Sequence, residues 1–150
     1  MIPLGALLTQ NLNMMSIPKN LISLSEFLDM KKMFESTLQP KMGKQETRSV
    51  WIPLDELKNY LAYVENEASK KGIKVSGIRF HMLAQTKANN QLTLALTSTY
   101  EEASKHVDFD PIFSSKEKPA TLKSLESDNQ KSEEKGGILN RMAPCPVICS

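Results

Sequence analysis

Two consecutive segments with a strict two-residue alternation constrain the fold of this chain more than any other feature. Within residues 75–84, Ile78, Phe80 and Met82 alternate with polar or small residues, and residues 91–98 repeat the pattern with Leu92, Leu94 and Leu96. The connection between them is polar and includes two consecutive asparagines, which tolerate the left-handed backbone of turns. We therefore predict an antiparallel hairpin whose apolar face is centred on Phe80 and Leu94.

Two amphipathic helices are predicted before the hairpin. Ser23 and Glu26 have the spacing of a capping box, and an apolar stripe with helical spacing follows them as far as Pro40. A second apolar stripe begins after Pro53 and ends at Gly72, a favourable residue just beyond a helix. Because two strands alone are marginal in water, we expect the helices to cover the apolar face of the hairpin.

The predicted fold class is therefore α+β, with two helices packed on a small antiparallel sheet. Residues 49–52 favour an extended backbone and are a candidate third strand. We place the domain at residues 21–113, after a loosely ordered extension at residues 1–20. Residues 114–137 are rich in Lys, Glu and Ser and are predicted to be a disordered polar linker. The remaining residues, 138–150, form a C-terminal motif that contains both cysteines.

Charge and hydropathy exclude several classes of protein. The net charge is only +2, and acidic and basic residues are mixed along the chain, which argues against a nucleic-acid partner. No apolar run approaches the roughly 18 to 20 residues of a transmembrane helix. The apolar first eight residues lack the basic start of a signal peptide, so we expect a cytoplasmic protein. Met1 and Met15 are both candidate start residues.

The most specific local feature is the pair Cys145 and Cys149. Its C-x3-C spacing differs from the C-x2-C of zinc ribbons, and two cysteines provide only half of the roughly four ligands of a structural zinc. A zinc site would therefore need both His81 and His106 as well. The other interpretations are a disulfide in a small loop, a thiol pair that reacts with a partner, and two unpaired thiols, of which we favour the last.

A second candidate site lies on the polar face of the predicted hairpin. Arg79 and His81 project from the first strand, and Thr93 and Thr97 are expected beside them on the second. An arginine next to a histidine is suited to binding a carboxylate or phosphate. The simpler interpretation, which we favour, is a solvated face without a ligand. No phosphate loop, dinucleotide fingerprint, zinc-protease motif or nucleophile elbow is present.

The order of short motifs resembles a family of small Bacteroidetes proteins. The matching segments are ISLSE at 22–26, PLDELK at 53–58, GIRF at 77–80, the aliphatic strand at 92–97 and CPVIC at 145–149. The resemblance implies a bacterial source and one domain, and it implies no reaction.

The chain departs from the pattern of this family at two places. His81 and Met82 stand where the family has an aromatic residue and a glycine, and Val147 replaces a proline. Both departures lie at candidate sites, so a site shared by the family need not be intact in this chain.

Three functional hypotheses follow from the sequence. We favour a non-enzymatic domain that binds a protein partner or small ligand through the Arg79 and His81 face or the C-terminal cysteines. The first alternative is a thiol- or metal-dependent protein that uses Cys145 and Cys149. The second is an enzyme built on Arg79 and His81 with an acid such as Glu101, which lacks the signature of any reaction class.

Overall fold

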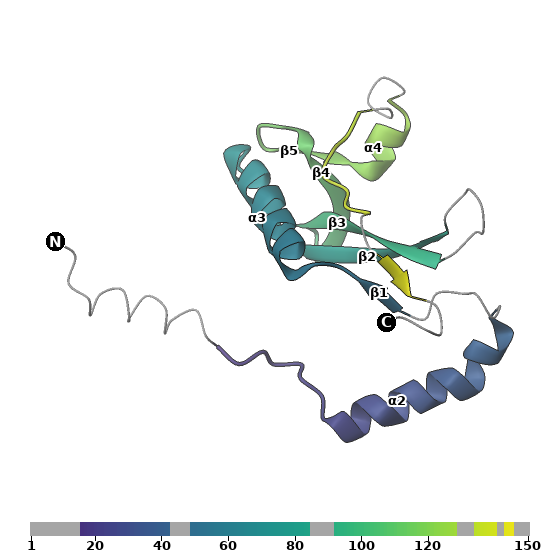
Figure 1. Ribbon diagram of the computed structural model, residues 1–150. Helices are drawn as coiled ribbons and strands as arrows, with labels where there is room; N and C mark the ends of the chain where they lie inside the picture. Colours follow the sequence, from purple (N-terminus) through teal and green to yellow (C-terminus); the bar gives the residue numbers. More distant parts are fainter. Residues whose placement is uncertain (1–15, 43–48, 85–91, 129–133, 141–142, 146–150) are drawn as a thin grey trace, which may run out of the picture. The chain divides into compact units, whose positions relative to one another are not determined.

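A computed structural model describes five stretches of the chain (Figure 1), namely residues 16–42, 49–84, 92–128, 134–140 and 143–145. The chain divides into two units, Met1–Gly43 and Lys44–Ser150, which are described separately below.

The first unit contains helix α2 (Leu24–Thr37), followed by the 3-10 helix η1 (Gln39–Lys41). The predicted capping box is confirmed, because Ser23 Oγ accepts from the Glu26 amide at 3.1 Å and Glu26 Oε2 accepts from the Ser23 amide at 2.8 Å. These bonds lower the pKa of Glu26. Helix α2 contains no buried residue.

The second unit is an α+β domain, as the alternation of the sequence predicts. Helix α3 (Leu54–Lys70) follows Pro53 and ends before Gly72, which has a φ of +70°. The sheet is antiparallel with the strand order β2-β3-β4-β5. Its strands are β2 (Gly77–Ala84), β3 (Leu92–Glu102), β4 (Lys105–Ser115) and β5 (Lys118–Thr121).

The candidate third strand at residues 49–52 forms, but in a different sheet. Strand β1 (Ser49–Trp51) pairs antiparallel with β6 (Ala143–Cys145), and this pair is separate from the four-stranded sheet. Ser49 lies opposite Cys145 in the register. The C-terminal motif therefore contributes backbone pairing to the domain.

Regular structure also occupies part of the region predicted to be a disordered linker. Strand β4 continues to Ser115, β5 returns along it, and the short helix α4 (Leu122–Glu126) follows. Thr121 caps this helix, because its Oγ1 accepts from the Ser124 amide at 3.1 Å. The prediction of disorder fails for residues 118–126 because strand pairing and capping stabilise them without many large apolar side chains.

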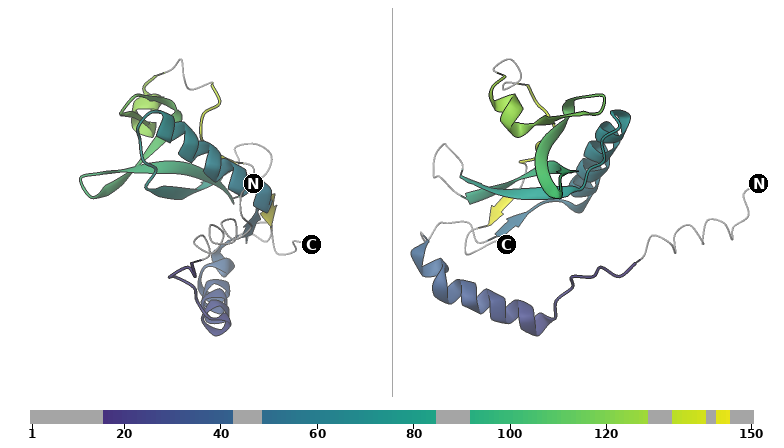
Figure 2. Two further views of the ribbon diagram at one scale, coloured as in Figure 1. Left: turned by 90° about the vertical axis from the view of Figure 1, so that its left-hand side faces the viewer. Right: turned by 180° about the vertical axis from the view of Figure 1, so that it is seen from behind.

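Helix α3 and helix α4 lie on opposite sides of the sheet (Figure 2). Two groups of buried residues join α3 to the strands. Tyr60 and Val64 pack with Leu96, and farther along the helix Ala68 packs with Ile73 and Phe109.

The position of Phe80 requires a correction. This side chain was expected at the centre of the core with Leu94, but it is 58% exposed, and Leu94 is half-buried. The reason is the strand order: α3 packs on β3, on β4 and on Ile78 of β2, whereas Phe80 lies farther along the edge strand and outside this cover.

A C-terminal segment completes the sheet beside β3. Leu96 and Leu139 exchange two backbone hydrogen bonds of 2.8 and 3.1 Å. The buried carboxylate of Asp110 accepts from the amide of Gly137, and a Cβ atom at Gly136 would overlap this carboxylate. Residues 136–140 are therefore part of the folded domain.

None of the helices in the described stretches is long and apolar enough to cross a membrane.

Candidate functional site

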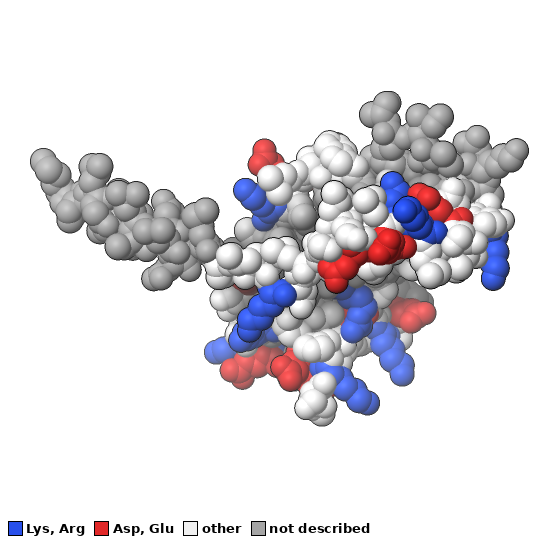
Figure 3. All heavy atoms as spheres, turned by 90° about the horizontal axis from the view of Figure 1, so that it is seen from below, with Lys and Arg blue, Asp and Glu red and all other residues white. Residues whose placement is uncertain are grey.

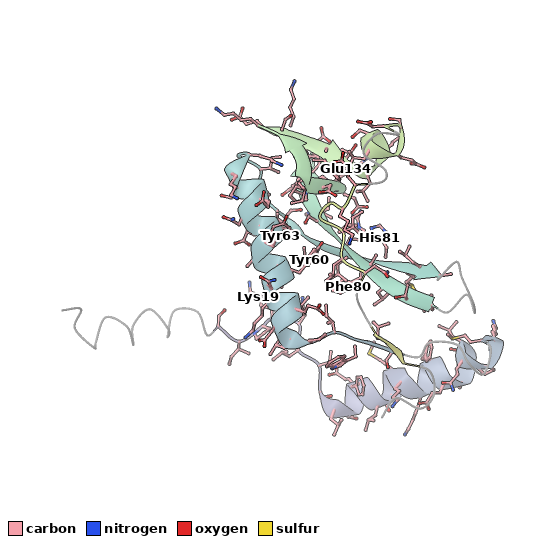
Figure 4. The ribbon with its side chains drawn as sticks, turned by 45° about the horizontal axis from the view of Figure 1, so that its top comes forward. Lys19, Tyr60, Tyr63, Phe80, His81 and Glu134 are labelled. Carbon is pink, nitrogen blue, oxygen red and sulfur yellow. The ribbon has the colours of Figure 1, made fainter. Side chains whose placement is uncertain are left out.

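Polar side chains gather on the sheet face opposite α3. Leu96 of β3 points toward the helix, so its neighbour Thr97 points away from it. The register places Arg79 opposite Thr97, on the same face. His81 also lies on this face, whereas Phe80, between these two residues, lies on the other; Figure 4 labels both Phe80 and His81.

The side chain at the centre of this face is Asp108 of β4. Its Oδ1 lies 2.9 Å from Arg79 Nη1, and its Oδ2 lies 3.3 Å from His81 Nε2. Arg79 Nη2 also donates to the backbone carbonyl of His106 at 2.9 Å. Both sides of the guanidinium are thus engaged within the chain. The predicted residues Arg79 and His81 do meet, but Asp108 occupies the position where an external anion was expected.

The third predicted residue on this face, Thr93, lies outside the cluster. It pairs with Leu83 in the register, and its side chain is only 3% exposed. Its Oγ1 has no hydrogen-bond partner among the described residues. The predicted ligand-binding set is therefore only partly brought together.

The hydrogen bonds around His81 fix the direction of each donor. Thr97 Oγ1 donates its single proton to Asp108 Oδ1 at 3.1 Å, because an ionised carboxylate only accepts. The same hydroxyl lies 3.1 Å from His81 Nε2, so it must accept from the N–H of that ring. His81 consequently does not act as a base toward Thr97, and the arrangement is not that of a nucleophile with its base.

A second chain of hydrogen bonds runs through Ser76 and His106. Thr99 Oγ1 donates to the carbonyl of Gly77 at 3.1 Å, so in its 2.9 Å contact with Ser76 Oγ it accepts. Ser76 has then used its proton and accepts from Nδ1–H of His106 at 3.0 Å. This serine is therefore not activated by the histidine either.

Two surface hollows share Ser76 and His106. The larger has a volume of about 680 Å³ and the smaller about 390 Å³. The charged and aromatic groups that line the larger are Lys74, Tyr100, Glu101, Glu102, His106 and Glu117. Burial raises the pKa of Tyr100, and the hydrogen bond that its hydroxyl donates to Glu102 raises it further. The hollows offer polar contacts but no aligned reactive group.

Of the two cysteines, only Cys145 lies within the described residues, and it is not in the four-stranded sheet that carries this face. Cys145 pairs with Ser49 in the two-stranded sheet, and Cys149 lies outside the described residues. Within the described ranges no three His, Cys, Asp or Glu side chains are placed to hold a metal ion together.

Asp108 and Ser76 were not predicted from the sequence, and His106 was predicted only as a possible zinc ligand. A signal was available, because His106, Asp108 and Asp110 alternate with Val107 and Phe109 as in a strand. Comparison of the chain with protein-family models, with curated proteins and with solved structures gives no match.

Proposed function

We propose that the chain is a non-enzymatic binding domain for a polypeptide partner, which adds an extended strand to the outer edge of β2. Strand β2 ends the strand order, and no other strand in the described stretches pairs with its outer edge. The observation that carries the proposal is the apolar surface of this edge strand: Phe80 is 58%, Met82 72% and Leu83 43% exposed. An added strand would satisfy its outward backbone groups and cover these side chains.

The two edges of the sheet differ in a way that supports this proposal. Strand β5, at the opposite edge, has four residues, and Lys118 and Pro119 are two of them. Short length, lysine and proline are the usual means by which proteins protect an edge from pairing. Strand β2 has eight residues without lysine or proline, and its one arginine is already paired with Asp108. An exposed edge of this kind is typical of a site of strand addition or of aggregation.

The polar cluster of Arg79, His81 and Asp108 favours binding over catalysis. Arg79 is neutralised by Asp108, and neither histidine is placed to take a proton from the hydroxyl beside it. An enzyme at Arg79 and His81 would need a reactive group that this arrangement does not provide.

The same proposal includes a cytoplasmic location and kinship with the Bacteroidetes family. It also includes a protein partner and not a nucleic acid. Figure 3 shows one face of the molecule, on which positive and negative side chains are interspersed. A mixed surface of this kind supports a protein partner, because nucleic-acid binding uses a continuous basic surface. A zinc- or thiol-dependent role for Cys145 and Cys149 remains the alternative.

Crosslinking from a defined position tests the proposal. A photoreactive amino acid is placed at Met82, and a matched one at Leu54, which is 64% exposed at the start of α3. We expect the Met82 probe to capture a discrete partner in lysate of the source organism and the Leu54 probe not to capture it. Equal capture from both positions contradicts a site at β2.

Binding of the purified partner then gives the quantitative test. The double variant Phe80→Ser, Met82→Ser should weaken binding at least about tenfold, because each apolar side chain loses roughly 1.5 to 3 kcal/mol of burial. Leu54→Ser should leave binding unchanged. Hydrogen exchange should show slower exchange of β2 amides in the complex, and a complex that protects none of them refutes strand addition.

A further inference from the structure

The apolar stripe of helix α2 has no use in the binding proposal above. Its apolar residues Leu24, Phe27 and Leu38 are 51% to 72% exposed, and Phe34 is half-buried. A helix of 14 residues is marginal in water on its own, and a stripe of this width normally packs against another surface. The question is which surface fits it.

The spacing of the stripe is that of a short coiled coil. Leu24, Phe27, Phe34 and Leu38 occupy alternate three- and four-residue steps, and Lys31 takes the central position of the series. A single lysine at such a position specifies register and partner at some cost in stability. Any partner of this stripe must therefore provide a group that interacts favourably with the ammonium group of Lys31.

We propose that α2 pairs with α2 of a second copy of the chain in an antiparallel arrangement. A two-fold axis relates the two helices. When residue 31 of one copy lies opposite residue 34 of the other, residue 27 of one copy lies opposite residue 38 of the other. Phe27 then faces Leu38 of the other copy at both ends. In the middle, each Lys31 faces the ring of Phe34 and lies one position from Glu35 of the other copy.

A second copy fits this helix better than a lipid surface does. The helix carries three acidic and two basic side chains, Glu26, Asp29, Glu35, Lys31 and Lys32. Membrane-surface helices are enriched in Lys and Arg on the polar face, which this composition does not provide. A parallel pair is also disfavoured, because it would set the two Lys31 side chains against each other. The antiparallel pairing instead places each Lys31 beside Glu35 of the other copy.

Sedimentation equilibrium of the full chain tests the pairing. Two 14-residue helices bury less area than a standard interface, so concentrations up to about 1 mM are needed. We expect Lys31→Glu and Glu35→Lys each to raise the dissociation constant about tenfold, since each change acts twice in the dimer. The double variant restores the opposite charges and should return to within about threefold of the wild type.

Lys32→Glu is the matched control, because Lys32 is the neighbour of Lys31 but lies outside the stripe. It should leave the dissociation constant unchanged, and far-ultraviolet circular dichroism should show equal helix content in all variants. A chain that stays monomeric at about 1 mM overturns the proposal. The proposal is also overturned if the double variant associates more weakly than either single variant. It is overturned as well if Lys32→Glu raises the dissociation constant as much as Lys31→Glu does. Association abolished by Phe80→Ser and insensitive to Lys31→Glu would assign the contact to β2 instead.

Discussion

Replacing Asp110 by asparagine should release the C-terminal segment from the sheet. The Asp110 side chain is 2% exposed and accepts from the Gly137 amide through both oxygens, at 3.0 and 2.9 Å. Its Oδ1 also accepts from the Ile112 amide at 2.9 Å. Asparagine has nearly the same volume as aspartate and keeps one oxygen. If that oxygen takes the place of Oδ1, the NH₂ group takes the place of Oδ2 and faces the N–H of Gly137, so two donors meet.

The expected loss follows from these contacts. A hydrogen bond to a charged group contributes roughly 1.5 to 3 kcal/mol, so Asp110→Asn should cost about 2 to 3 kcal/mol of unfolding free energy. Asp110→Ala leaves the amides of both Ile112 and Gly137 without an acceptor and should cost about 3 to 5 kcal/mol. Domains of this size have only about 5 to 15 kcal/mol in total, and each kcal/mol shifts the Tm by roughly 4 to 8 °C.

Urea unfolding followed by Trp51 fluorescence and circular dichroism measures the loss. Trp51 is a suitable probe, because it lies opposite Ala143 in the β1–β6 pair. Hydrogen exchange at the Leu139 amide, which donates to Leu96, reports release of the segment directly. Asp29→Asn, at an exposed carboxylate of α2, is the control. A loss below about 0.5 kcal/mol in Asp110→Asn would mean that desolvation of the carboxylate cancels its hydrogen bonds, and would refute this reasoning.

Three further outcomes are expected. Gly136→Ala should cost about 1 to 3 kcal/mol in the same urea assay, because the new Cβ overlaps the carboxylate of Asp110; unchanged stability would mean that the segment is not packed there. Burial raises the pKa of Tyr60 from 10.0 to about 12, so the unfolded chain loses this proton first. Stability should therefore fall as the pH rises from about 10 to 12, and more steeply than in Tyr60→Phe; parallel pH profiles would contradict a buried phenol. Asp108→Ala should free Arg79, so that phosphate raises the Tm of the variant and not of the wild type; equal shifts would show that Arg79 is already accessible to anions.

The elements that the sequence predicts well are those whose signals are local. The capping box at Ser23 involves residues three apart, and helix α3 is bounded by Pro53 and Gly72. The alternation of β2 and β3 also gave the correct antiparallel hairpin, in which Phe80 pairs with Leu96. Each of these features is decided by residues within one helix or one hairpin.

The elements that were missed depend on contacts between distant residues. Pro111 lies within β4, and a proline normally argues against a strand; here an irregular register between Asp110 and Ser115 accommodates it. Without β4, neither the edge position of β2 nor the pairing of Arg79 with Asp108 can be derived. Gly136 and Gly137 pack against the carboxylate of Asp110, which is more than 20 residues away in the sequence, so only the structure shows this contact.

The polar cluster and the exposed edge are parts of one arrangement. Arg79 reaches across β3 to the carboxylate of Asp108 and to the carbonyl of His106, so two contacts tie β2 to β4. An edge strand held in this way loses little conformational freedom when another strand pairs with it, and pre-ordering of this kind reduces the entropy cost of binding. The charges that resemble a ligand site would then act on binding indirectly, by keeping Phe80 and the outward backbone groups of β2 in the extended geometry that a partner strand requires.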